Sequence, residues 1–206
     1  MNIGFALVTG GSFFDDIVSI ENELHEYCGF HNKLEKISNI PHTTIFQGGF
    51  KDDANYSMIL QDIKEFFVSN MSDFQLHFQD VVYVPNGWYF YTCKKTEELN
   101  RLHCFTLGRC KDHIILSPDR LNRNLSDMTE SQINGVEKYG YRYSGNAFFP
   151  HITLGRNDGE MKKEIITSLS DKLALLPTDV DIDRITVYKM GKDGMHSETL
   201  DEIKIR

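Results

Sequence analysis

Two short segments of the chain contain a histidine and a threonine two positions apart, each directly after a proline. They are Pro41-His42-Thr43-Thr44 and Pro150-His151-Ile152-Thr153. Both lie among β-branched and apolar residues, which favour extended strands. Because side chains alternate between the two faces of a strand, the histidine and threonine of each segment share one face. Each segment, which we call an HxT motif, therefore presents an imidazole and a hydroxyl side by side.

Two such pairs, if brought together, could hold a phosphate and cleave a phosphodiester. An imidazole has an ordinary pKa of about 6.5, so it can accept or donate a proton near neutral pH. Displacement at phosphorus needs one group to take a proton from the attacking oxygen and another to supply one to the leaving oxygen. His42 and His151 could divide these roles, although the sequence leaves open which is the base. The hydroxyls of Thr44 and Thr153 could donate hydrogen bonds to phosphoryl oxygens.

A metal site is the main competing interpretation of paired histidines. The residue two places after each histidine is threonine rather than a strong ligand, and the sequence has no His-Glu-x-x-His motif. The four cysteines also form no Cys-x-x-Cys pair. A Gly-x-Ser-x-Gly motif and a Gly-Lys-Ser/Thr phosphate loop are both absent. We therefore expect no metal and no other cofactor.

The elements that must position the motifs occur twice in the same order. Before the turn at Pro85-Asn86-Gly87, the hydrophobic spacing predicts strands at 3–8, 42–47 and 74–84 and helices at 13–27 and 57–68. After it, strands at 88–93, 148–154 and 182–190 and helices at 97–107 and 160–175 repeat the order, and 199–205 adds a last strand. The motifs fall on the second strand of each half. This indicates a duplicated fold, with residues 1–206 forming one domain.

Composition and charge limit the possible partners. The chain has 206 residues, of which 40 % are hydrophobic and 25 % charged, as in ordinary globular proteins. We find neither a leader-like N-terminus nor an apolar run long enough for a membrane span, and expect a cytoplasmic monomer. The net charge of −8 argues against binding along extended duplex nucleic acid. Between Arg101 and Arg156, the segment that includes the second motif, eight basic residues outnumber five acidic ones, whereas the rest of the chain has a net charge of −11.

The two motifs resemble those of the 2H phosphoesterases, a superfamily that includes bacterial 2′-5′ RNA ligase-like proteins and cyclic nucleotide phosphodiesterases. Residues 149–156, Phe-Pro-His-Ile-Thr-Leu-Gly-Arg, are very similar to the second motif of that family. The first motif is a looser match, because Thr43 stands where the family often has an aliphatic residue. The similarity in length and element order covers nearly the whole chain. It implies a bilobal α/β (α+β) fold of duplicated β-α-β-α-β units, with antiparallel sheets lining a central cleft.

The resemblance also implies an activity. The family opens 2′,3′-cyclic phosphates or related 2′-linked phosphodiesters of nucleotides or RNA ends without a metal or cofactor. By similarity, His42 and His151 would be the acid and base, and Thr44 and Thr153 would hold the phosphate. Two alternatives stay open: an ATP-independent 2′-5′ RNA ligase, and a nucleotide- or RNA-binding module without turnover. The sequence does not identify the substrate.

Four further residues could bind substrate. Arg156 could form a guanidinium fork to phosphate, or it could make an ordinary surface ion pair. Tyr139, Tyr141 and Tyr143 alternate and would share one face if their segment is extended, which would form a wall for base stacking. The alternative is that they pack in the core or in a hairpin. Residues 111–146 show little periodicity, as is typical of a lid or a specificity loop.

Overall fold

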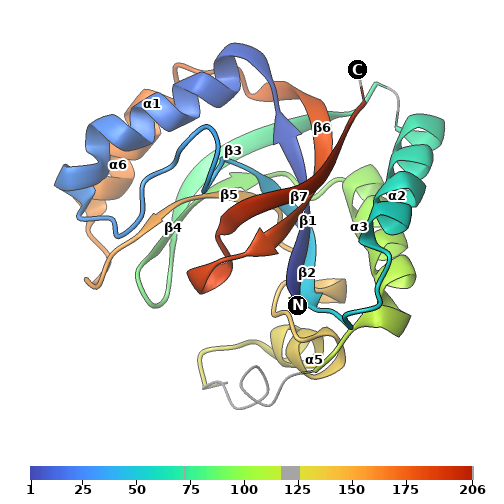
Figure 1. Ribbon diagram of the computed structural model, residues 1–206. Coiled ribbons are helices and arrows are strands. Elements are labelled where there is room, and N and C mark those ends of the chain that lie inside the picture. The colour runs from blue at the N-terminus through green and yellow to red at the C-terminus, as the bar shows by residue number, and fades with distance from the viewer. Residues whose placement is uncertain (72, 117–125, 206) are drawn as a thin grey trace.

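The structure is a computed structural model that describes residues 1–71, 73–116 and 126–205. Its strands are β1 (Asn2–Thr9), β2 (Thr43–Gly49), β3 (Gln75–Val84), β4 (Trp88–Cys93), β5 (His151–Arg156), β6 (Asp179–Met190) and β7 (His196–Lys204). Its longer helices are α1 (Gly11–Cys28), α2 (Tyr56–Asn70), α3 (Glu97–Cys110), α5 (Glu130–Tyr139) and α6 (Lys163–Leu173). The described strands form one antiparallel sheet in the order β1-β2-β5-β4-β3-β6-β7, and β1 also pairs with β6 (Figure 1). Because β1 also pairs with β6, the six strands from β1 to β6 form a closed ring of pairings. Strand β7 pairs with β6 outside this ring.

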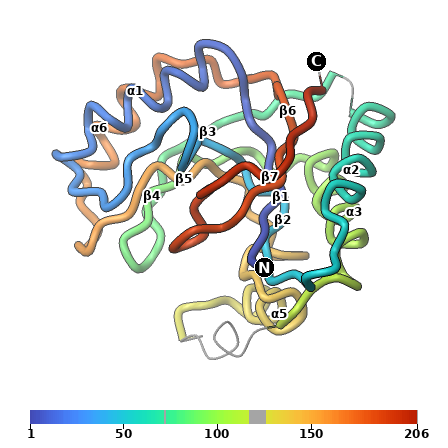
Figure 2. Tube along the Cα trace, viewed as in Figure 1, coloured from blue at the N-terminus to red at the C-terminus, as the bar shows by residue number. Residues whose placement is uncertain are grey.

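The duplication predicted from the sequence is present in the strand pairings. β1 pairs with β2 and β6, and its counterpart β4 pairs with β5 and β3. Within each half the first strand pairs with the motif strand, whereas the pairings β1–β6, β3–β4, β2–β5 and β3–β6 all join one half to the other. Helices α1 and α6 form one packed pair and α2 and α3 form the other, on two sides of the strands (Figure 1 and Figure 2). This confirms a mixed α+β fold of duplicated units with an antiparallel sheet, whereas the central cleft stays a prediction.

Both motif strands contain a β-bulge at the same place. Ile45 in β2 and Leu154 in β5 are the extra residues in the ladders with β1 and β4, and each directly follows the motif threonine. A bulge shifts the alternation of side chains by one residue. The next residues on the motif face are therefore Gln47 and Arg156, which are half-buried, whereas the residues between them and the motif threonines are buried. Simple alternation would have placed Gln47 and Arg156 on the opposite face.

The predicted elements agree with the structure in order and type, but several ends differ. The predicted strand 148–154 begins only at His151 and runs to Arg156, because a 3-10 turn at Gly145–Ala147 precedes it and Pro150 has no N–H for the ladder. The predicted helix 160–175 is shorter and spans Lys163–Leu173.

The segment 111–146 contains a helix that the sequence analysis missed. Helix α5 begins with a capping box, in which the Thr129 side chain accepts from the N–H of Gln132 and the Gln132 side chain accepts from the N–H of Thr129. It ends at Tyr139 and is capped by Gly140, whose φ of 70° is left-handed and suits glycine. Tyr139 therefore ends a helix, and the premise that the three tyrosines lie on an extended segment is wrong. Part of the segment, residues 117–125, lies outside the described residues.

The described helices include none that is both long enough and apolar enough to cross a bilayer.

Candidate active site

The two HxT motifs lie next to each other at the junction of the two halves. Strands β2 and β5 pair antiparallel at Thr43 and Ile152, the middle residues of the motifs. Both residues are only 1 % exposed, so their side chains face the core. The four catalytic candidates therefore project from the opposite face. One further step of the antiparallel register places each motif histidine opposite the threonine of the other motif.

Both motif histidines are held in the same way. Nδ1 of His42 lies 2.7 Å from the carbonyl oxygen of Ile40, and Nδ1 of His151 lies 2.7 Å from the carbonyl oxygen of Phe149. A carbonyl oxygen only accepts hydrogen bonds, so Nδ1 carries the proton and Nε2 is the basic nitrogen of each neutral ring. The residue that supplies the carbonyl precedes a proline and is biased towards extended backbone. Each motif proline thus helps to hold the preceding carbonyl oxygen where it accepts from Nδ1 and fixes the tautomer of the histidine.

His151 lies in a cage of aromatic rings. Its ring stacks on Phe90 at 3.8 Å between centroids, and the edge of Tyr143 meets it at 5.5 Å. Burial lowers the pKa of His151 to about 4, against the opposing effect of the hydrogen bond to Phe149, and the nearby His42 lowers the pKa further. At neutral pH this ring is therefore uncharged, which suits a general base.

His42 has more polar neighbours. Its ring centroid is 5.0 Å from that of Tyr188 on β6 and 5.8 Å from that of His196 on β7. Burial also lowers the pKa of His42, and the hydrogen bond to Ile40 opposes this effect. A phosphate anion bound between the two rings would raise the pKa of both, because it favours the charged form of a nearby imidazole. A bound substrate would therefore help to charge the histidine that acts as the acid.

The motif threonines differ in their hydrogen bonds. The hydroxyl oxygen of Thr44 lies 3.3 Å from that of Tyr188, whose hydroxyl also donates to Oε1 of Gln47 at 3.1 Å. Within the part of the chain that the structure describes, the hydroxyl of Thr153 has no hydrogen-bond partner. The sequence analysis missed Tyr188 and Gln47. Gln47 could have been found by aligning the two motifs, because it occupies the position of Arg156.

Arg156 shares the motif face through the bulge and binds a neighbouring hairpin. Its Nη1 lies 3.2 Å from Oδ2 of Asp193, in the short 3-10 turn Lys192–Gly194 between β6 and β7. Its Nε donates to the carbonyl oxygen of Asn86 at 3.1 Å, in the turn between β3 and β4. The tip of the β6–β7 hairpin also approaches Gln47, since a Cβ added to Gly194 would lie 3.1 Å from Nε2 of that side chain. Gln47 and Arg156 therefore both lie against this hairpin tip.

Of the three candidate tyrosines, Tyr143 contacts a motif histidine through its ring. Tyr141 lies against Tyr143 at 5.7 Å, and Tyr139 lies beneath the ammonium group of Lys138 at 5.3 Å. Tyr143 is 7 % exposed, and burial raises its pKa. This ring packs against His151, and its low exposure agrees with the core-packing interpretation.

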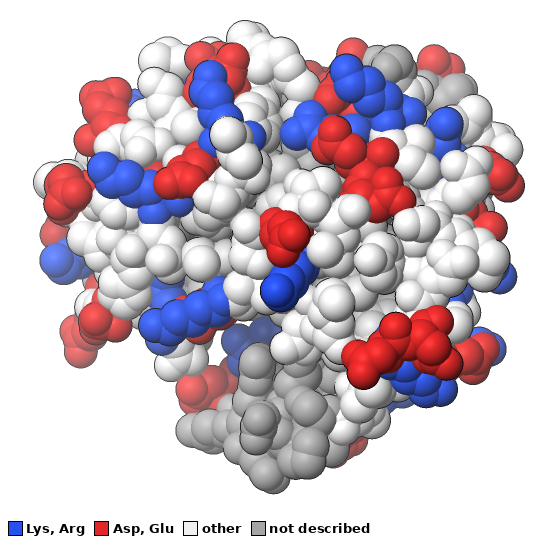
Figure 3. Space-filling model, viewed as in Figure 1, with Lys and Arg blue, Asp and Glu red and all other residues white. Residues whose placement is uncertain are grey.

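The charges around the motifs are mixed. Arg142 lies beside the cage of His151, with its guanidinium carbon 5.8 Å from the centroid of Tyr143. Two other basic residues of the segment between Arg101 and Arg156, namely Arg120 and Arg123, lie outside the described residues. On the face shown in Figure 3, acidic and basic side chains are interspersed. This pattern differs from the continuous basic surface that extended nucleic acid requires.

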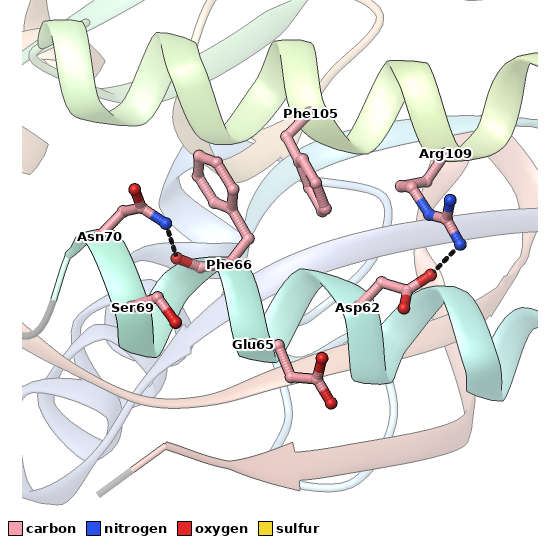
Figure 4. Close-up of a pocket in the computed structure, with 7 residues that line it drawn as sticks. All are labelled: Asp62, Glu65, Phe66, Ser69, Asn70, Phe105 and Arg109. Atoms are coloured by element: carbon pink, nitrogen blue, oxygen red, sulfur yellow. Dashed lines mark hydrogen bonds and ion pairs between the residues drawn. The ribbon is translucent and has the colours of Figure 1, made fainter.

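The two cavities that we describe lie away from the motifs. A cavity of about 350 Å³ lies between α2 and α3, where the rings of Phe66 and Phe105 stack at 4.4 Å and Arg109 pairs with Asp62 (Figure 4). A second cavity of about 550 Å³ includes His77 and Asp179. Neither is lined by a motif residue. Among the described residues, His, Cys, Asp and Glu side chains form no group of three that could hold a metal ion.

Comparisons with known proteins do not identify a family. No protein-family model matches the chain, and no curated protein matches it. A solved structure with a similar arrangement is that of a conserved protein of unknown function from Agrobacterium tumefaciens strain C58. The two chains are 14 % identical, the alignment covers 100 % of this chain and 85 % of the other, and the TM-score is 0.47.

Proposed function

We propose that the protein is a metal-independent phosphodiesterase of the cytoplasm that opens a 2′,3′-cyclic phosphate, or a related 2′-linked phosphodiester, of a nucleotide or RNA terminus. The main support is the pairing of Thr43 with Ile152, which brings two histidines of the same tautomer to one face. Two imidazoles with free Nε2 atoms can act as a base and an acid on one phosphorus atom.

The reaction can be written with the residues of the two motifs. Nε2 of one histidine takes a proton from a water molecule as the water oxygen attacks phosphorus. The bond from phosphorus to one ribose oxygen breaks, and the second histidine, protonated at Nε2, gives its proton to that oxygen. The hydroxyls of Thr44 and Thr153 would donate to the two non-bridging oxygens, whose charge the transition state must stabilise. The roles of the histidines exchange in the reverse direction.

The direct test is an assay of the purified protein on adenosine 2′,3′-cyclic phosphate and on an RNA oligonucleotide that ends in a 2′,3′-cyclic phosphate. We expect a phosphomonoester product, formed equally well in EDTA. The double variant His42→Ala/His151→Ala serves as the blank, and His113→Ala, a histidine outside the motifs, as the matched control. Loss of activity in EDTA, or a fully active double variant, would contradict the proposal.

The same assay separates the alternatives. A second RNA with a 5′-hydroxyl, added without ATP, would be joined through a 2′-5′ linkage by a ligase. Tight binding of a 2′-phosphonucleotide without turnover of any cyclic substrate would indicate a binding module.

A further inference from the structure

The hydroxyl of Tyr188 lies between the first motif and the bulge that follows it. It is 3.3 Å from the hydroxyl of Thr44 and 3.1 Å from Oε1 of Gln47. Tyr188 is on β6 and is fully buried, so its hydroxyl is not available to bulk solvent. Thr44 and Gln47 reach it from one strand because the bulge at Ile45 turns both side chains to the same face.

The ring of Tyr188 is fixed on three sides. It stacks on His196 at 4.8 Å and lies 5.0 Å from His42. On the third side it passes directly over Gly4, where an added Cβ would lie 2.2 Å from Cζ of the tyrosine. The absence of a side chain at Gly4 therefore makes room for the ring. With the ring fixed, the position of its hydroxyl beside Thr44 is fixed too.

The hydrogen bonds along Thr44, Tyr188 and Gln47 must run in one direction. Burial raises the pKa of Tyr188 well above its ordinary value, so its hydroxyl keeps its single proton. When Tyr188 donates that proton to Oε1 of Gln47, the bond between Tyr188 and Thr44 requires Thr44 to donate. A threonine that donates to Tyr188 cannot donate to a phosphoryl oxygen.

A half-turn of the Gln47 amide reverses the chain of bonds. An amide carries two donors on nitrogen and only acceptors on oxygen, and its two ends have nearly the same shape. With Nε2 facing Tyr188, Gln47 donates to Tyr188 and Tyr188 donates to Thr44. The proton of Thr44 is then free for a phosphoryl oxygen. The second motif has no such chain in the described residues, because Arg156 takes the place of Gln47 and is paired with Asp193.

We propose that Gln47 and Tyr188 are positioning residues whose hydrogen bonds, through the orientation of the Gln47 amide, decide whether Thr44 can donate to the bound phosphate. This inference rests on the proposed function, because it assumes that a phosphate lies against Thr44.

The test uses Gln47→Glu, since an ionised carboxylate can only accept and therefore holds the chain in the direction that occupies Thr44. We expect kcat on the cyclic phosphate to fall about tenfold, the value of one hydrogen bond to a charged group. Gln79→Glu, which makes the same change at an exposed position of β3, is the matched control. A negative charge could also repel the substrate directly, so the change must be repeated in a Thr44→Val background.

The double-mutant cycle distinguishes these causes. An effect that acts through Thr44 disappears in the Thr44→Val background, whereas direct repulsion persists there. A tenfold loss that remains undiminished in that background, or wild-type kcat in Gln47→Glu, would overturn the inference. If the wild type opens no cyclic phosphate, the proposed function fails and the affinity for inorganic phosphate becomes the readout. If Gln47→Glu then binds phosphate more weakly, and this loss disappears in the Thr44→Val background, the inferred role of Gln47 and Tyr188 is supported. Equal phosphate binding by all variants overturns it.

Discussion

The first HxT motif lies beside a tyrosine and a histidine that can form hydrogen bonds, and the second lies in a cage of aromatic rings. His42 contacts Tyr188 and His196, whereas His151 stacks on Phe90 and meets the edge of Tyr143. The backbone features of the two motifs are nevertheless the same: a proline, a carbonyl that holds Nδ1, and a bulge after the threonine. The duplication has thus kept the parts that set the position and tautomer of the histidines. The surroundings, which set polarity, have diverged.

The difference continues at the first residue beyond each bulge. Gln47 is neutral and can either donate or accept, whereas Arg156 is a permanent cation that is already paired. Both lie against the tip of the β6–β7 hairpin, so the two motifs are linked through a segment that belongs to neither. We infer that the first motif, through Gln47, sets the direction of its hydrogen bonds. The second motif has the fixed charge of Arg156 and a histidine that is shielded from solvent.

The largest expected effect is the loss of either histidine. His42→Ala and His151→Ala should each lower kcat by about 100-fold or more, as expected for a general acid or base. If both act in one step, the double variant should be little slower than either single variant. A rate measured for the three proteins, with circular dichroism to confirm folding, checks this. Near-wild-type turnover of either single variant would show that the histidine it lacks is neither the acid nor the base.

The next effect concerns stability in acid. The pKa of the buried His151 is about 4 in the folded chain and about 6.5 when the chain is unfolded. Above pH 6.5 both states are neutral and the residue has no effect. As the pH falls from 6.5 towards 4, only the unfolded chain binds the proton, so the free energy of unfolding decreases, by as much as about 3 kcal/mol.

Urea unfolding at several pH values measures this loss. The slope of the free energy of unfolding against pH reports how many more protons the unfolded chain binds than the folded one. We expect this number to be lower by about one in His151→Gln over that range. His113→Gln is the control. An unchanged slope in His151→Gln would show that the aromatic cage does not hold the ring neutral.

A smaller effect separates the two threonines. Thr153→Val should lower kcat by about 30-fold and Thr44→Val by about tenfold, because the hydroxyl of Thr153 is not occupied by another described side chain. Valine keeps the shape and removes the hydroxyl. Steady-state kinetics on a cyclic nucleotide compare the two variants, and a larger loss in Thr44→Val would reverse the proposed contrast.

The smallest effect tests the role of Arg156. Asp193→Asn removes its ion-pair partner, and the pair is partly exposed, so the stability should change by only about 0.5 kcal/mol. We expect KM for an anionic substrate to fall about twofold if the freed guanidinium reaches the phosphate. Asp158→Asn, an exposed carboxylate paired with His31, is the matched control. An unchanged KM would show that Arg156 holds the β6–β7 hairpin in place and does not bind the substrate.

Local patterns in the sequence were sufficient for much of the fold. The turn at 85–87 and the strand Trp88–Cys93 could be predicted because turn residues and apolar alternation act over a few positions. Helix α5 was missed because it has only ten residues, of which Gly135 and Val136 are buried, and only Ile133 and Val136 among them are aliphatic. Its capping box, Thr129 with Gln132, was the signal that could have revealed it. That omission also left open an extended segment through Tyr139, Tyr141 and Tyr143, although Tyr139 belongs to the helix.

The sequence by itself determined the two His-Thr pairs, the face that each pair shares and the repeated order of elements around them. These properties follow from alternation along a strand, which is local. The tertiary structure alone decided that Thr43 faces Ile152, that the bulges turn Gln47 and Arg156 towards the motifs, and that Tyr188 reaches Thr44 over Gly4. Register and bulges depend on which residues of distant strands pair, and that choice is made by packing across the whole sheet.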